Sequence, residues 1–365
     1  MTPLTPVDHR SRLRIVLAAV VSVIAWIVLQ AASPRPAISW SEEMLEAADR
    51  MQQATTTVAQ FCEAAGVQVD ESRDPNRTCL VGPEYTTLFT TLGQLEAKRT
   101  TTNPDVAGLL VHLLREAGVT AGDTIAVGAS ASFPALLIAT LAAAEAMDVI
   151  PVTIISLGSS SYGATRPEFN LLHIYELLLD EGLLSTPAAG ISLGGENDVG
   201  AEFDAVFGEA LLRQIRISGI PLVSDPDLNG NVNQRLAIYS GTAENGVAVF
   251  VNIGGSDANL GISPLVLEVT PGLHTELTLP PPNERGVLFE MGARGVPVIH
   301  LLHVRGLAQR YGLPWDPIPL PNPGATVLRN IVTKPTRSFW LITAGYFASL
   351  GLIAFAGRDR STNRP

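Results

Sequence analysis

The sequence has little basic charge and lacks the common nucleotide-binding strings. Its 24 Lys and Arg residues are outnumbered by 35 Asp and Glu residues, which gives a net charge of -11. Binding to nucleic acid requires a basic surface that neutralises phosphates, so no nucleic-acid partner is expected. The sequence contains no Walker A string, and no GxGxxG follows the first expected strand. Neither nucleotide fingerprint is therefore present.

Cysteine is almost absent as well. Only Cys62 and Cys79 occur, which excludes a disulfide-rich scaffold and a zinc ribbon. The two residues lie close together in a polar region. They are expected to form a disulfide if this region is extracytoplasmic, and to remain two free thiols if it is cytosolic.

Apolar residues are abundant. The chain has 365 residues, of which 46% are hydrophobic and 16% charged, and its mean hydropathy is +0.25. This composition allows a large core in one or two domains and indicates membrane segments. An uncharged segment ends near Ser33 and fits either a signal peptide or an uncleaved anchor. A second such segment near the other end of the chain, Ser338–Ala356, favours the anchor.

Arginines before the first apolar segment place the N-terminus in the cytoplasm by the positive-inside rule. The expected protein is a two-pass protein of the cell membrane whose central domain is extracytoplasmic. Its segments are a cytoplasmic N-terminus (1–14), a transmembrane helix (15–33), an α/β domain (41–311), a Pro-rich linker (312–337), a second transmembrane helix (338–356) and a cytoplasmic tail (357–365).

The segment Thr124–Thr165 organises the domain. It contains an apolar strand at Thr124–Val127, an Ala/Leu-rich helix at Phe133–Met147 and a β-branched strand at Val149–Leu157. Two strands joined by a helix form a right-handed βαβ unit with parallel strands. The fold class predicted is therefore α/β, with a Rossmann-like, mostly parallel sheet and helices on both faces.

Further elements follow the same alternation. Helices are expected at 41–65, 106–117, 167–184, 203–218, 231–240 and 286–294, and strands at 190–195, 220–223, 246–253 and 296–302, with 265–279 partly strand.

Loops that combine glycine with polar residues follow four of the strands. Such loops bring backbone amides and hydroxyls to the sheet edge where open α/β sheets bind ligands. The alternative is that Gly and Ser only make tight βα turns. With a basic run before the first strand, the candidate ligand-binding residues are Lys98, Arg99, Ser130, Ser132, Ser159, Ser160, Ser161, Gly194, Gly195, Glu196, Asn197, Asp198, Gly254, Gly255, Ser256 and Asp257.

Serines in these loops are also candidate nucleophiles. The string at Gly128–Ser132 resembles the strand-to-helix turn of a nucleophile elbow, although Ser132 replaces the last glycine. Ser130 or Ser160 would then need a histidine base with a carboxylate behind it. The candidates are His173, His300 and His303 as base, and Asp198 or Asp257 as carboxylate. The alternative is that these serines are structural.

A divalent cation is the one cofactor considered. Glu196, Asp198 and Asp257 offer the oxygen ligands that Mg²⁺ or Ca²⁺ prefer, although such residues also occur in simple turns. Zinc is weakly supported, because the sequence has no HExxH or CxxC, and His300 and His303 would lie on opposite faces of a strand.

Five short strings of the sequence, most of them in the loops described above, follow one another along the chain in the order found in a known family. They are Thr90–Gly93, Glu96–Pro104, Gly158–Ala164, Gly194–Gly200 and Asn252–Gly255. In this combination the chain resembles the poly-gamma-glutamate system protein family, membrane-anchored proteins associated with bacterial poly-γ-glutamate synthesis and export. The resemblance covers most of Glu84–Leu313. It implies a pathway, with poly-γ-glutamate, synthase membrane subunits and the lipid bilayer as partners, and supplies no catalytic residues.

The first functional hypothesis is therefore an accessory membrane protein of poly-γ-glutamate production. An acidic protein that contacts a polyanion needs a local basic patch. Candidates for that patch are Lys98, Arg99, Arg166, Arg294 and Arg305. The second hypothesis is a polymer-acting hydrolase or transferase with a serine nucleophile. The third is a scaffold that packs against synthase helices through Gly345 and Gly351.

Overall fold

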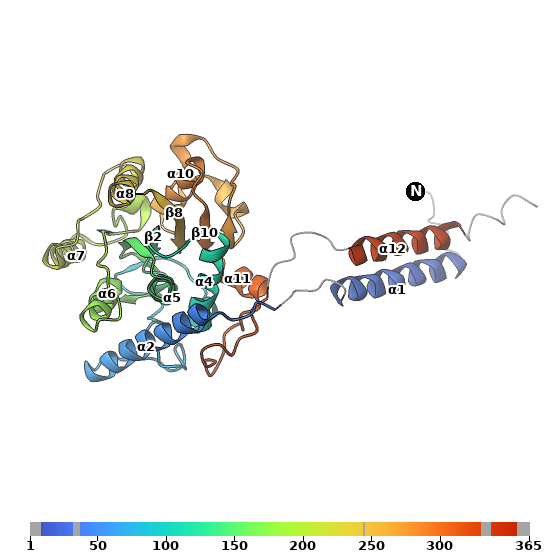
Figure 1. Ribbon diagram of the computed structural model, residues 1–365, viewed down its shortest axis with the longest axis horizontal. Coiled ribbons are helices and arrows are strands. Elements are labelled where there is room, and N and C mark those ends of the chain that lie inside the picture. Colours follow the sequence, from blue (N-terminus) through green and yellow to red (C-terminus); the bar gives the residue numbers. More distant parts are fainter. Residues whose placement is uncertain (1–8, 32–36, 244, 330–336, 356–365) are drawn as a thin grey trace, which may run out of the picture. The chain divides into compact units, whose positions relative to one another are not determined.

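The structure, a computed structural model, describes residues 9–31, 37–243, 245–329 and 337–355 (Figure 1). It divides into two units, which are a domain at Ile38–Leu328 and a unit formed by both ends of the chain. The predicted C-terminal tail, the end of the first apolar segment near Ser33 and most of the predicted linker after Leu328 lie outside the described residues.

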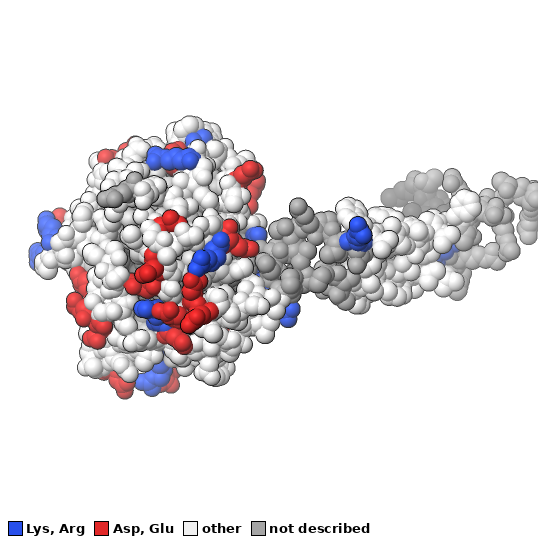
Figure 2. Space-filling view, viewed as in Figure 1, with Lys and Arg blue, Asp and Glu red and all other residues white. Residues whose placement is uncertain are grey.

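Two helices form the unit at the chain ends. These helices, α1 (His9–Ala31) and α12 (Arg337–Phe355), pack against each other, and the Oγ of Ser22 lies 3.0 Å from the phenolic oxygen of Tyr346. On the face of this pair that Figure 2 shows, the described side chains are mostly uncharged, with a few basic ones. The stretch Arg12–Leu29 is long and apolar enough to cross a membrane, whereas the apolar part of α12 is shorter than this. One candidate span is therefore present among the described residues.

A six-stranded sheet forms the centre of the domain. Its strands lie in the order β7 (Gly190–Ser192), β3 (Ile150–Ser156), β2 (Thr124–Ser130), β8 (Val247–Ile253), β10 (Val298–Leu301) and β9 (Gly272–His274). Every neighbouring pair is parallel except β10 and β9. If the five parallel strands are numbered 1 to 5 along the chain, their order across the sheet is 3-2-1-4-5, which is typical of a doubly wound sheet. The predicted mostly parallel α/β sheet is confirmed, and its strand order reverses between β2 and β8.

Helices cover both faces of this sheet. On one face, α5 (Pro134–Ala146) packs against α2 (Glu42–Ala64) and α4 (Asp105–Glu116). Because α5 contacts the sheet on one side and α2 and α4 on others, nearly all of its residues are buried, and its small alanines allow the close approach. On the other face, α8 (Leu228–Thr242) and α10 (Val287–Ala293) contact each other and the strands.

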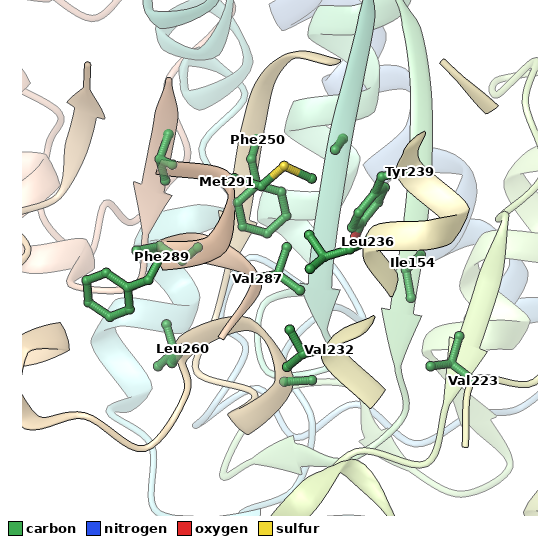
Figure 3. Packing of buried hydrophobic residues seen from close by; sticks show 14 of the residues in the cluster. Ile154, Val223, Val232, Leu236, Tyr239, Phe250, Leu260, Val287, Phe289 and Met291 are labelled. Carbon is green, nitrogen blue, oxygen red and sulfur yellow. The ribbon is translucent and has the colours of Figure 1, made fainter. Parts of the chain in front are cut away.

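The core under α8 and α10 is formed by every second side chain of the strands, those that face these two helices. Ile154 and Phe250 point toward Leu236 and Tyr239 of α8 and toward Met291 of α10 (Figure 3). The next residues along the strands point to the opposite face, as a period of two requires. Buried residues on both faces explain why these strands read as continuous apolar runs.

The remaining elements connect and flank the sheet. They are β1 (Phe89–Thr91), α3 (Leu95–Thr101), β4 (Ser159–Ser160), β5 (Thr165–Arg166), β6 (Phe169–Asn170), α6 (Leu171–Asp180), α7 (Ala205–Ser218), α9 (Asp257–Leu260), α11 (Val304–Tyr311) and 3₁₀ helices at Glu196–Asp198, Pro264–Glu268 and Pro282–Glu284.

Two expected elements differ from the prediction. The helix expected from residue 167 begins only at Leu171, because Asn170 caps it by accepting hydrogen bonds from the N–H groups of Leu172 and His173. The strand expected at 220–223 is reduced to a single bridge between Leu222 and Ile191.

The prediction of a Pro-rich linker is wrong for residues 312–328, which belong to the domain. Arg99 donates two hydrogen bonds of 2.6 Å to the carboxylate of Asp316. The buried carboxylate of Asp105 accepts from the backbone N–H groups of Gly324 and Thr326. These charge-assisted contacts attach the segment to the domain, and its apolar side chains Leu313 and Leu328 are buried. Ile38 also donates to Leu328, so both ends of the domain lie side by side.

A disulfide joins Cys62 of α2 to Cys79, closing a loop with a sequence separation of 17. We expect the double variant Cys62→Ser, Cys79→Ser to lower the free energy of unfolding by about 3 kcal/mol, because the unfolded chain gains the entropy of the open loop. Thermal unfolding of the full chain, with and without reductant, measures this. Reductant should lower the midpoint of the wild type and leave that of the variant unchanged. An equal response of the two proteins would contradict the prediction.

Candidate active site

A cavity of about 420 Å³ lies at the carboxyl ends of the parallel strands, where the strand order reverses. All five strings that carry the family resemblance contribute to it or support its walls. Among the predicted ligand-binding residues, those that line it are Lys98, Ser130, Ser132, Ser160, Gly194, Gly195, Glu196, Gly255, Ser256 and Asp257. Arg99, Ser159, Ser161, Asn197, Asp198 and Gly254 do not line it.

A lysine and a serine meet in this cavity. Lys98 lies on α3, and Ser160 lies on β4, just beyond the end of β3. The Nζ of Lys98 is 2.7 Å from the Oγ of Ser160 and donates a 2.5 Å hydrogen bond to the carbonyl oxygen of Ser132. Lys98 is only 3% exposed, and its amine lies 3.6 Å from the centroid of the Phe133 ring.

The lysine amine has no carboxylate partner among the described residues. Burial lowers the pKa of Lys98 well below its usual value, because the ammonium form loses its hydration. The Phe133 ring face favours the ammonium form. The pKa of Lys98 is nevertheless lowered, and desolvation is the cause. A neutral amine keeps its N–H donors for the Ser132 carbonyl and presents a lone pair to the hydroxyl of Ser160. Lys98 can therefore act as a base toward Ser160.

Backbone contacts hold the serine in place. The strand β4 pairs with β1, the N–H of Ser160 donates to the Oγ of Ser132, and the N–H of Ser161 donates to the carbonyl of Thr91. Gly93 packs directly against Lys98 and Ser160. A Cβ at this position would lie 2.6 Å from the carbonyl oxygen of Ser161 and 3.0 Å from the Oγ of Ser160. The segment before α3 therefore needs glycine to approach the serine.

The histidine bases proposed from the sequence are not in position. Among the described residues no serine hydroxyl is hydrogen-bonded to a histidine. His300 is buried and interacts with the amide of Asn252 at 3.0 Å, and burial lowers its pKa to about 4. His303 lies exposed at the edge of the cavity. The Oγ of Ser130 is buried without a hydrogen-bond partner. The interpretation of Ser130 as a nucleophile with a histidine base is therefore wrong. The base beside Ser160 is Lys98, which the sequence analysis placed in a basic patch.

Three of the five residues proposed for the basic patch are engaged in other contacts, whereas Arg294 and Arg305 are exposed. Lys98 points into the cavity, whereas Arg99 pairs with Asp316. Arg166 is buried and donates to the backbone carbonyls of Cys79 and Val81. Acidic and basic side chains are interspersed on the face of the domain in Figure 2.

Asp198 belongs to a buried ion pair behind the cavity. Its carboxylate lies 2.6 Å from a guanidinium nitrogen of Arg235, and both side chains are fully buried. The hydroxyls of Ser156 and Ser192 complete the network. Asp198 is therefore occupied and is wrongly included among the cation ligands. In the described part of the chain no group of three His, Cys, Asp or Glu side chains is placed to hold a metal ion.

Carboxylates gather on the cavity wall formed by the segments that follow β7 and β8. Glu196 and Asp257 were expected there, and Glu202 joins them. Burial, with a smaller contribution from neighbouring carboxylates, raises the pKa of Asp257. Arg305, at the start of α11, also lines the cavity. It follows β10, the parallel strand farthest in the sheet from β7. No sequence pattern indicated Glu202, which lies outside every glycine loop.

Comparison with known proteins found no matching family model, curated protein or solved structure. The chemistry of the cavity is therefore inferred from its geometry.

Proposed function

We propose that the domain is a serine acyl hydrolase or acyltransferase in which Ser160 is the nucleophile and Lys98 the general base. The observation that carries this proposal is the 2.7 Å contact between the buried Lys98 amine and the Ser160 hydroxyl in the cavity. A serine hydroxyl is a weak nucleophile unless a base removes its proton, and a desolvated lysine can serve as that base.

The reaction proceeds in two balanced stages. The Oγ of Ser160 attacks the carbonyl carbon of an amide or ester, while the neutral Lys98 amine takes the hydroxyl proton. The tetrahedral intermediate collapses, Lys98 returns this proton to the departing amine or alcohol, and an acyl ester remains on Ser160. Water or an acceptor amine then attacks the ester, and Lys98 transfers the proton of the attacking group back to the Oγ of Ser160.

The substrate proposed is poly-γ-glutamate, whose backbone amides would be the acyl donors. Support comes from the family resemblance, because its strings surround the cavity. A disulfide favours an oxidising compartment, and α1 is suited to anchor the chain. We therefore propose an accessory protein of poly-γ-glutamate production, held in the cell membrane by α1 and α12 with its domain outside. Synthase membrane subunits would be its neighbours.

The test is incubation of the full chain, purified in detergent, with poly-γ-glutamate. Polymer length is followed by size exclusion with light scattering, and new amino groups are counted in parallel. We expect shortening with one new amino group for each bond cut. Unchanged length and amino-group count would contradict the acyl-transfer mechanism, and co-elution of intact polymer would then support an accessory binding role.

The pH dependence of this reaction follows from the lowered pKa of Lys98. Only the neutral amine accepts the serine proton, so kcat/KM should be low while Lys98 is protonated and rise to a plateau above its pKa. Because burial lowers this pKa, the rise should lie well below pH 10.5. A pH profile of kcat/KM measures it. A rise that begins only near the ordinary lysine value would rule out Lys98 as a desolvated base.

A further inference from the structure

The acidic wall of the cavity has no cationic partner. Glu196, Glu202 and Asp257 all line the cavity, and none of them forms an ion pair among the described residues. Burial is the main cause that raises the pKa of Asp257, and repulsion from the two glutamates adds to it. A cation bound here would relieve this repulsion.

The carboxylates are held in place by the backbone of the loop. Both carboxylate oxygens of Glu202 accept hydrogen bonds from the N–H of Glu196, at 2.9 and 3.2 Å. The carboxylate of Asp257 accepts a 3.0 Å hydrogen bond from the N–H of Asn197, so it is attached across the crevice to the same loop. Two of the three carboxylates are therefore positioned before any ligand arrives.

Two buried hydroxyls line the same cavity and have no partner. Ser256, next to Asp257, is 8% exposed, and Ser130 at the end of β2 is 3% exposed. The Oγ atoms of both make no hydrogen bond with the described residues. A buried hydroxyl without a partner is costly, so these groups indicate a polar ligand in the cavity.

The chemistry of this wall favours an organic ammonium over a metal ion. A metal needs several ligands that converge on one point, and the described residues offer no such group of three. A primary ammonium has three donors that can be directed to separate acceptors, and carboxylate and hydroxyl oxygens provide them.

On the basis of the proposed function, we propose that the site selects acyl donors with a free primary ammonium close to the reacting carbonyl. Glu202 and Asp257 would hold this ammonium, with the hydroxyl of Ser256 beside them, while Ser160 attacks the carbonyl. A polymer would then be processed at its amino-terminal unit, because internal units carry no free amine.

The test compares two chromogenic esters that differ only in this group, alanine p-nitrophenyl ester and N-acetylalanine p-nitrophenyl ester, corrected for spontaneous hydrolysis. With the full chain we expect kcat/KM to be about 10-fold higher for the free amine. Asp257→Asn or Glu202→Gln should lower this ratio to near one. Glu268→Gln, an exposed carboxylate outside the cavity, is the control and should keep it. A ratio that Asp257→Asn leaves unchanged would overturn the proposal.

Binding measurements separate this proposal from the catalytic one. Calorimetry with the Ser160→Ala variant should detect binding of alaninamide and at least 10-fold weaker binding of N-acetylalaninamide. The additional change Asp257→Asn should remove this difference. If neither ester is hydrolysed but alaninamide binds selectively, the acyl-transfer mechanism fails and the ammonium site stands. Equal or undetectable binding of both amides would overturn the site.

Discussion

Replacing Ser160 by alanine is expected to lower the rate of acyl transfer by about 10³-fold or more, because the attacking oxygen is removed. The fold should persist, since the change removes one hydroxyl and leaves the hydrogen bond from Lys98 to the Ser132 carbonyl. Ser161→Ala is the matched control. Ser161 is the next residue and is also buried. Its hydroxyl has no hydrogen-bond partner among the described residues and does not line the cavity.

Lys98→Met tests the base of the same pair. Methionine resembles the apolar stem of lysine but lacks the amine that accepts a proton, so the rate should fall by about 10²-fold to 10⁴-fold. The double variant with Ser160→Ala should be no slower than Ser160→Ala alone, because the two residues act as one unit. Loss of polymer shortening in Ser161→Ala as well, or normal rates in Lys98→Met, would refute the assignment.

The stability of Lys98→Met provides a second measurement. Between the lowered pKa of Lys98 and its ordinary value, the unfolded chain binds one more proton than the folded chain. The free energy of unfolding therefore rises with pH in this window, and acidification removes that stability. In Lys98→Met this contribution to the pH dependence should disappear. Chemical unfolding at several pH values measures the change.

Asp198→Asn is expected to lower the free energy of unfolding by about 3–5 kcal/mol, the largest stability effect that we predict. Asp198 and Arg235 are fully buried, and their closest nitrogen–oxygen distance is 2.6 Å. The variant leaves the guanidinium charge buried and uncompensated, while asparagine cannot replace both carboxylate oxygens. Because this pair supports the loop that carries Glu196, the acidic wall of the cavity should loosen as well.

Glu46→Gln is the control for this prediction. Glu46 pairs with Arg50 on α2, where the two side chains are 46% and 43% exposed, and exposed pairs of this kind contribute about 0.5 kcal/mol or less. Denaturant unfolding of the full chain compares the two variants. Combining Asp198→Asn with Arg235→Met should recover part of the loss, because no buried charge then remains. Equal effects of Asp198→Asn and Glu46→Gln would show that the buried pair is not a structural determinant.

The loops at the carboxyl ends of the strands were predictable from the sequence because parallel strands bring their ends to one edge. Ser130, Ser160 and Gly255 were placed together on this ground and line one cavity. The base was missed for a physical reason. A lysine beside an arginine in a polar string normally indicates solvated charge, and only the packing of α3 against the cavity shows that Lys98 is buried.

Local patterns determined the elements themselves. The β-branched run at Val149–Leu157 and the Ala/Leu-rich segment after Phe133 specify a buried strand and a buried helix, because the periods of two and 3.6 depend only on neighbouring residues. Residue pairs that are distant in sequence were decided by tertiary structure alone. Arg235 neutralises Asp198, Asp316 pairs with Arg99, and Lys98 reaches Ser160 across 62 positions of the chain. Whether a charged side chain is solvated, paired or desolvated depends on what the fold places around it, and this decides its chemistry.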